Sequence, residues 1–207
     1  MNPRRSFLSR LGFAAAALTV GSTTTSAQRA GDWQPARESK DDWFDQIPGK
    51  HRLFFDTLTD GGLREARAFT NNYYDGSKSG YGLEPADLAV IICLRHSATP
   101  FAFGDAFWAK YGSAIAESLK LADTTLVTNP HRAQLETLGK RGVHYAVCDM
   151  ASHRYAGHIA RKIDGGNADA IYKEMTETVI GNAHFVPAGI IAVNRAQERG
   201  YSIAYTG

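Results

Sequence analysis

The chain has 207 residues, of which 43% are hydrophobic and 21% charged, and its formal net charge is +2. A chain of this length and apolar content suits a single domain with a sizeable core. The near balance of charges, with no stripe of lysine and arginine, argues against a nucleic-acid partner. Beyond residues 1–27, no run is apolar for long enough to cross a membrane.

The first residues have the pattern of an export signal. Arg4 and Arg5 precede an apolar run over 11–20 and a run of small residues that ends at Ala27, which resembles a twin-arginine signal peptide with its cleavage site. We therefore expect residues 1–27 to be removed and the mature protein to be periplasmic; a leader retained as a membrane anchor is the alternative. The leader holds three arginines and no acid, so the mature chain would carry 20 basic and 21 acidic side chains.

The mature part is expected to have two regions. Residues 28–47 are polar, with scattered aromatic residues and no period, and they predict an extended N-terminal arm whose aromatic side chains pack on the domain or on another subunit. Residues 48–207 predict a single domain of the α/β class.

Predicted strands and helices alternate within that domain. Short runs rich in β-branched and aromatic residues predict five strands, at 51–56, 88–94, 143–147, 183–186 and 201–205. Apolar spacing and turn residues predict six helices. The first starts at Gly61 and ends before a turn at 75–80, and the second runs from Thr99 to Tyr111. The others cover 132–140, a segment that starts at Ser152, 168–180, and a segment from Pro187 that ends at Gly200. This alternation predicts a mainly parallel sheet with helices on both faces and a ligand site beyond the carboxyl ends of the strands.

Two of the predicted helices have distinctive apolar faces. The helix after the second strand carries aromatic residues on two sides, namely Phe101, Phe103, Phe107, Trp108 and Tyr111. One side should pack on the sheet, and the other is either buried in the same chain or contacts a neighbouring subunit or a ligand. In the last helix, Ile190, Ile191 and Val193 are predicted to form the buried side.

Cys148 lies where the strand 143–147 runs into a helix. A thiol at a helix start faces free backbone N–H groups, and the positive end of the helix dipole favours its thiolate form. Cys148 is therefore our candidate nucleophile; the alternative is a small residue that fits a tight turn. The adjacent Asp149, a candidate binding residue, acts in the opposite direction because a nearby carboxylate raises the pKa of a thiol.

The second cysteine, Cys93, lies inside the apolar run 88–94, where a buried cysteine usually behaves as a small hydrophobe. An even number of cysteines in an exported chain is also compatible with a disulfide. A bridge to Cys148 would need α-carbons within about 7 Å of each other. We favour two free thiols.

Arg95 and His96 directly follow the strand 88–94. Because the carboxyl ends of parallel strands meet at one edge of the sheet, both residues are expected to share a crevice with Cys148. There they would stabilise a thiolate or bind a small anion; capping the following helix is the alternative.

Several histidines raise the question of a metal or haem site. The spacing Cys148-x4-His153-x4-His158 fits no zinc pattern, since steps of five residues turn successive side chains to different faces of a helix. We therefore predict no metal and no cofactor. A metal- or haem-binding periplasmic protein stays as the weakest alternative.

Three segments together resemble the DsrE-like sulfur-relay family: 147–151 after a strand, 186–190, and 197–201. The likeness extends from about Asp87 to the end of the chain. It implies a flavodoxin-like three-layer α/β/α sandwich and assembly into dimers, trimers or hexamers. It also implies that the cysteine at position 148 accepts sulfane sulfur as a persulfide and passes it to a partner.

Two features depart from the family pattern. The relay members are cytoplasmic, whereas this chain carries an export signal, and the segment 99–111 with the insertion after it is larger than in the compact relay proteins. We expect an exported carrier or binder of sulfur species that acts through Cys148, a sulfurtransferase-like carrier rather than a turnover enzyme. Its partners would be a sulfur-containing small molecule or a sulfur-carrier protein, and further copies of the chain. The precursor would also bind the twin-arginine export machinery. The alternative is a non-catalytic oligomeric module that binds a small ligand or a partner.

Overall fold

The structure, a computed structural model, describes residues 34–207. The predicted signal peptide and the first residues of the arm lie outside this part of the chain. Residues Arg37–Gly207 form one unit with its own core. Among the described residues, no helix combines the length and the apolar character that a membrane crossing requires.

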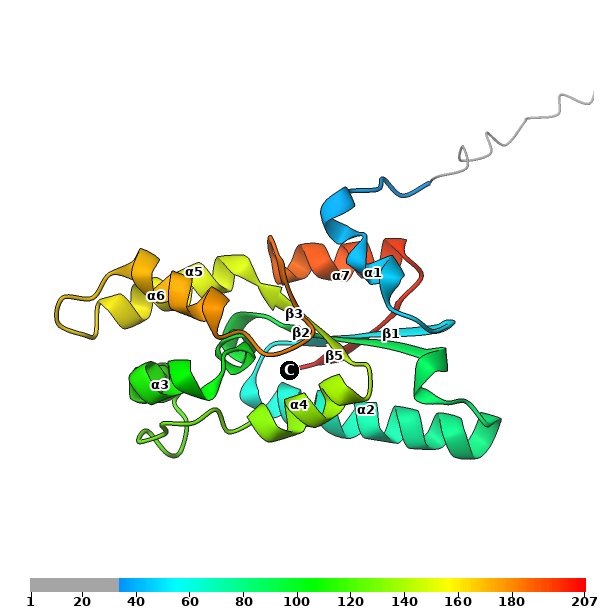
Figure 1. Cartoon of the computed structure of the whole chain (residues 1–207), viewed down its shortest axis with the longest axis horizontal. Helices are drawn as coiled ribbons and strands as arrows, with labels where there is room; N and C mark the ends of the chain where they lie inside the picture. The colour runs from blue at the N-terminus through cyan, green and yellow to red at the C-terminus, as the bar shows by residue number, and fades with distance from the viewer. Residues whose placement is uncertain (1–33) are drawn as a thin grey trace, which may run out of the picture. The chain divides into compact units, whose positions relative to one another are not determined.

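Five strands form one sheet in which all neighbours run parallel, in the order β4-β3-β2-β1-β5 (Figure 1). They are β1 (His51–Thr57), β2 (Leu88–Leu94), β3 (His144–Cys148), β4 (Ala183–Val186) and β5 (Ser202–Thr206). The five predicted strands are confirmed, each to within a residue at either end. As predicted, the last strand lies at an edge of the sheet.

Helices cover both faces of the sheet, unevenly. One face carries five helices: α2 (Asp60–Tyr81), α3 (Asp105–Leu119), α4 (Arg132–Lys140), α5 (Asp149–Ala160) and α6 (Ala168–Glu177). The other carries the short α1 (Trp43–Gln46) and α7 (Gly189–Glu198). Three short 3-10 turns complete the elements: η1 (Ser39–Asp41), η2 (Pro85–Asp87) and η3 (His96–Ala102). The fold is therefore a three-layer α/β/α sandwich of the flavodoxin-like kind, although the return from β4 to the far side of β1 makes its strand order different from that of flavodoxin.

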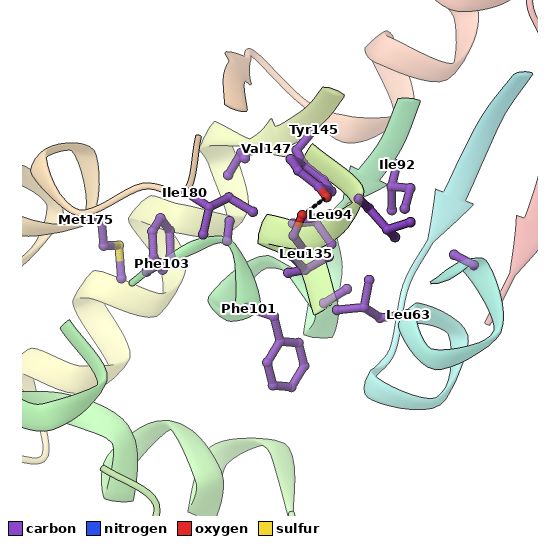
Figure 2. Packing of buried hydrophobic residues seen from close by; sticks show 14 of the residues in the cluster. Leu63, Ile92, Leu94, Phe101, Phe103, Leu135, Tyr145, Val147, Met175 and Ile180 are labelled. Atoms are coloured by element: carbon purple, nitrogen blue, oxygen red, sulfur yellow. Dashed lines mark hydrogen bonds between the residues drawn. The ribbon is translucent and has the colours of Figure 1, made fainter. Parts of the chain in front are cut away.

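The central strand β2 separates two hydrophobic clusters, and every one of its residues is buried. Val90, Ile92 and Leu94 belong to the larger cluster, under α2 to α6, while the residues between them belong to the smaller cluster, under α1 and α7. Figure 2 shows the larger cluster, where the buried Tyr145 hydroxyl donates a hydrogen bond to the carbonyl oxygen of Leu135 at 2.6 Å. That bond satisfies a polar group that would be costly to bury alone.

The aromatic segment after β2 differs from the prediction of one helix. A 3-10 turn runs from His96 to Ala102, and α3 starts only at Asp105, so the Thr99 side chain donates to the carbonyl of Leu94 instead of capping α3. The Trp108 indole donates to the Pro100 carbonyl at 3.1 Å. The large aromatics of this segment are fully buried within the chain, namely Phe101, Phe103, Phe107 and Trp108. Of the two expectations for this segment, burial within one chain is correct.

Three other helix boundaries also differ from the prediction. The polar stretch 75–80 continues α2 and does not end it; the helix ends at Gly82, whose positive φ of 68° forms the C-cap. Helix α5 begins at Asp149, directly after the strand, and α6 ends at Glu177.

In α7 the predicted buried side was wrong for Ile190 and Ile191, whereas Val193 is half-buried and packs on the smaller cluster as predicted. The helix begins at Gly189, and its buried residues are the small Ala192 and Ala196, whereas Ile190 is 61% exposed and Ile191 42% exposed. Small side chains let α7 lie close to the sheet, and this close approach turns the two large isoleucines outward.

The arm is helical where it was expected to be extended. It contains η1 and α1, and Phe44 is fully buried in the smaller cluster. The Tyr201 hydroxyl donates to the Phe44 carbonyl at 2.7 Å, and the Trp43 ring stacks on His184 with centroids 4.0 Å apart. The expected packing of arm aromatics on the domain is confirmed for these two residues.

Candidate functional site

The site lies where the chain changes from one face of the sheet to the other. Helix α5, which follows β3, packs on the larger cluster on one face, and α7, which follows β4, packs on the smaller cluster on the opposite face. In open α/β sheets, ligands bind in the crevice beyond the carboxyl ends of strands at such a switch point. A cavity of about 380 Å³ occupies this place, lined by Arg95, His96, Cys148, Met150, Ala151, Arg154, Ala188, Gly189 and Ile190.

Cys148 is the last residue of β3 and the N-cap of α5. The residue is 7% exposed and lines the cavity, so reagents in solution have limited access to its thiol. No side chain caps the start of α5, and the Ser152 hydroxyl donates to the Cys148 carbonyl at 3.0 Å. Among the N–H groups of the first helical turn, that of Met150 donates to the Pro187 carbonyl at 3.4 Å. Cys148 lies at the positive end of the α5 dipole.

Arg95 is held in the cavity wall by a buried carboxylate. Its Nε and Nη2 atoms lie 2.5 Å and 2.8 Å from the two oxygens of Asp56, which belongs to β1. This bidentate hydrogen bond raises the pKa of Arg95, so the guanidinium stays charged. Asp56 fixes the orientation of Arg95 and also balances most of its charge.

Gly189, the first residue of α7, lets Arg95 pass beneath the helix. A Cβ atom at position 189 would lie 2.5 Å from both the Cβ and the Cδ atoms of Arg95. No side chain fits into that space without a shift of the backbone or of Arg95. The glycine is therefore needed for the close contact between α7 and the end of β2.

His96 and Arg154 supply the less constrained polar groups of the cavity. His96 is exposed and has a left-handed backbone with φ of 54°, and its Nδ1 atom lies 2.9 Å from the Ser97 hydroxyl. Arg154 is exposed, and the Cζ atom of its guanidinium lies 5.3 Å from the centroid of the Tyr155 ring, a cation–π contact. Arg154 forms no ion pair within residues 34–207, so its charge is available to an anion in the cavity.

Asp149, predicted as a binding residue, is directed toward α6 and does not line the cavity. Its Oδ1 atom accepts a hydrogen bond of 2.5 Å from the Tyr172 hydroxyl, and its Oδ2 atom lies 3.8 Å from Nε2 of His153. Burial raises the pKa of Tyr172 to about 12, and the bond to Asp149 adds to this effect. Asp149, the sequence neighbour of the thiol, therefore makes these side-chain contacts outside the cavity.

The two cysteines have different surroundings, and both are free thiols. Cys93 is fully buried in the smaller cluster, with its Sγ atom 4.0 Å from the Gly189 carbonyl oxygen. Burial raises the pKa of the Cys93 thiol well above its usual value, so it stays protonated and unreactive. Of the two cysteines, only Cys148 lines the cavity.

The histidines are dispersed and do not form a metal centre. Within residues 34–207, no three His, Cys, Asp or Glu side chains are close enough together to hold a metal ion. His144 and His184 form a pair with ring nitrogens 3.0 Å apart, His153 stacks on Tyr172, and His158 contacts Arg161.

The structure thus brings together three of the four predicted site residues, Arg95, His96 and Cys148. It adds Met150 and Arg154, which lie one turn apart on the same side of α5. Their spacing of four residues was the available signal, but sequence alone does not tell which side of α5 faces the cavity.

No protein-family model matches the chain. No curated protein matches it significantly either. Among solved structures, the chain is similar to MTH1491, a protein of unknown function from Methanobacterium thermoautotrophicum, with a TM-score of 0.43 and 13% sequence identity. The alignment covers 75% of this chain and 99% of that protein. This distant likeness assigns no function.

Proposed function

We propose that the chain is an exported DsrE-like protein that carries sulfane sulfur as a persulfide on Cys148. The observation that carries the proposal is the position of Cys148: a free thiol, at a helix start, in the wall of a cavity at the switch point of the sheet. Its donors would be small sulfur species or a sulfur-carrier protein, and the twin-arginine leader would place it in the periplasm.

The charges around Cys148 support an anionic donor. Arg154 is an exposed guanidinium without an ion pair in the described part of the chain, and Arg95 is a second, fixed guanidinium. The apolar side chains of Met150 and Ile190 complete the cavity. A polysulfide anion matches this combination, because it carries charge at its ends and has a soft, weakly hydrated sulfur chain.

The proposed step exchanges one sulfur–sulfur bond for another. The Cys148 thiolate attacks a sulfane sulfur of the polysulfide; a bond forms between Sγ and that sulfur, and the shortened polysulfide leaves with the electron pair of the broken bond. In the return step, an acceptor thiolate attacks the outer sulfur of the persulfide, and the Cys148 thiolate leaves. No net oxidation or reduction takes place.

The experiment is polysulfide treatment of the purified protein, followed by intact-mass measurement. The wild-type protein should gain the mass of one or more sulfur atoms and lose it again with reductant. Cys148→Ser should abolish the gain, and Cys93→Ala, the matched control, should retain it because Cys93 is fully buried. Equal loading of Cys148→Ser and wild type would refute the proposal.

A second candidate function rests on a different observation, the exposed apolar rim of the cavity. Met150 at the start of α5 is 70% exposed and Ile190 at the start of α7 is 61% exposed, and both line the cavity. Ile191, the next residue of α7, is 42% exposed. Exposed apolar side chains that cluster in this way mark interaction sites. The second candidate is therefore an oligomeric binding module that buries this rim against another copy or a partner.

Substitution of the rim tests this second candidate. Ile190→Glu should shift the protein to a smaller species in light scattering coupled to size exclusion, since a buried charge without a partner is costly at an interface. The control is Phe69→Glu, on the distant and 49% exposed Phe69 of α2, which should leave the mass unchanged. A wild-type protein that is monomeric throughout would exclude assembly through the rim.

A further inference from the structure

A groove between α2 and α4 lies apart from the Cys148 cavity and shares no residue with it. The two helices lie side by side on the face of the sheet that carries the larger hydrophobic cluster (Figure 1). Arg141, directly after α4, donates a hydrogen bond of 2.6 Å to Asn71 of α2. The groove has a volume of about 290 Å³ and is lined by Arg64, Arg67, Ala68, Asn71, Gln134, Thr137 and Leu138. Two of its lining residues are arginines and none is acidic.

Arg67 is the unusual member of this group. Its Nε and Nη1 atoms are buried and have no hydrogen-bond partner, and it forms no ion pair with any residue of the described range 34–207. Burial lowers the pKa of Arg67, and the nearby Arg64 lowers it further. The residue as a whole is half-buried, and these two nitrogen atoms are costly because they have lost water without gaining a hydrogen-bond partner.

Asp60, the carboxylate whose charge acts on Arg67, is already committed to other partners. Asp60 forms an ion pair with Arg64, and its Oδ1 atom lies 2.5 Å from Nε2 of the buried His131. Asp60 raises the pKa of Arg67, but less than burial and Arg64 lower it. The positive charge of Arg67 is therefore left without a full counter-charge inside the chain.

The groove also contains two amide side chains, which can donate hydrogen bonds. Arg141 donates to Oδ1 of Asn71, which leaves the Nδ2 group of that amide free to donate. Gln134, on the opposite helix, adds a second amide. The Thr137 hydroxyl, by contrast, donates to the Ala133 carbonyl.

We propose that this groove binds a small oxyanion, such as inorganic phosphate or sulfate, with Arg67 as the principal contact and Arg64 and the Asn71 amide as additional donors. The oxyanion supplies the charge that Arg67 lacks. The groove is large enough for the ion and several waters, since each water takes up roughly 30 Å³. The site is independent of the proposed sulfur chemistry.

The test is thermal unfolding of the full chain in phosphate and in chloride at matched ionic strength. The wild-type protein should unfold a few degrees higher in phosphate, on the order of 3 °C at about ten times the dissociation constant. Sulfate and phosphate stabilise most proteins weakly by exclusion from the surface, so the comparison with variants is decisive.

Arg67→Gln should lose the extra stabilisation by phosphate, while its stability in chloride stays equal to or above that of wild type, because a half-buried guanidinium with two unpartnered nitrogen atoms has been removed. A purely structural role for Arg67 predicts the opposite in chloride.

The control, Arg161→Gln, removes an exposed charge on another part of the surface and should respond to phosphate as wild type does. If Arg67→Gln does not fold, Arg64→Gln provides the second test, since Arg64 is exposed and should weaken binding when replaced. A wild-type protein without a phosphate-specific rise, or variants with the same rise, would overturn the proposal.

Discussion

Single residues decide the shape of the cavity around Cys148. Asp56 holds Arg95 in place, and the absence of a side chain at Gly189 lets α7 approach the Arg95 stem. The contributions of Asp56 and Gly189 to this geometry are linked, because the Arg95 side chain passes beneath the start of α7 on its way to the Asp56 carboxylate. This arrangement makes Gly189 a sensitive position.

Gly189→Ala should therefore destabilise the protein. The added methyl group overlaps the Arg95 side chain, and overpacking of this kind costs about 1–3 kcal/mol. Urea unfolding measures the loss. Gly76→Ala is the matched control: Gly76 lies within α2 with open space around its Cβ position, and alanine there should be neutral or slightly stabilising. Equal stability of Gly189→Ala and wild type would contradict the role of the close contact.

At the scale of elements, the arm is attached to the sheet through a pair of histidines. Trp43 of α1 stacks on His184 of β4, whose Nε2 atom lies 3.0 Å from Nδ1 of His144. Burial, with a smaller effect of His144, lowers the pKa of His184 to about 4, and burial also lowers the pKa of His144. Both rings are therefore neutral in the folded protein near neutral pH.

This arrangement predicts a loss of stability in acid. The pKa of His184 is lower in the folded state than the ordinary value of 6.5, so its contribution is present above pH 6.5 and is lost as the pH falls toward about 4. His184→Gln should flatten the dependence of unfolding free energy on pH between these values, relative to wild type. His158→Gln, which replaces an exposed histidine, is the control. Chemical unfolding at a series of pH values measures the effect, and identical slopes for His184→Gln and wild type would disprove it.

The elements also show what can be predicted from sequence. The strands were predicted well because short apolar runs such as Leu88–Leu94 are bounded by polar residues and glycine. The helix ends were predicted less well, because Gly82 and not the polar stretch before it ends α2, and Pro100 lies in a 3-10 turn. The prediction that Ile190 and Ile191 lie on the buried side of α7 was wrong. The helix lies close to the sheet, where alanine fits and isoleucine does not, and this distance depends on tertiary packing.

The site was predictable to the extent that it depends on strand ends. Arg95, His96 and Cys148 come directly after or at the end of parallel strands, which topology brings to one edge. The direction of Asp149 and the contribution of Arg154 depend on how α5 is rotated and on its contact with Tyr172 in α6, and neither follows from a local pattern.

At the scale of the whole molecule, the uneven coverage of the sheet positions the candidate site. Four consecutive strands are joined over one face, and only the last connection crosses the other. The change of face falls between β3 and β4, and the cavity with Cys148 lies at that point. The buried aromatic segment stabilises the larger layer from within, so any assembly of copies would use other surfaces, of which the apolar rim is the first candidate.

The most direct test of the proposed sulfur carrier is the intact mass of the mature protein isolated from the periplasm without reductant, with peptide mapping of any added mass. The proposal predicts a chain that begins near Gln28 and carries one or more additional sulfur atoms on Cys148, which reductant removes. A periplasmic protein whose two thiols remain unmodified, both as isolated and after exposure to polysulfide, would contradict it.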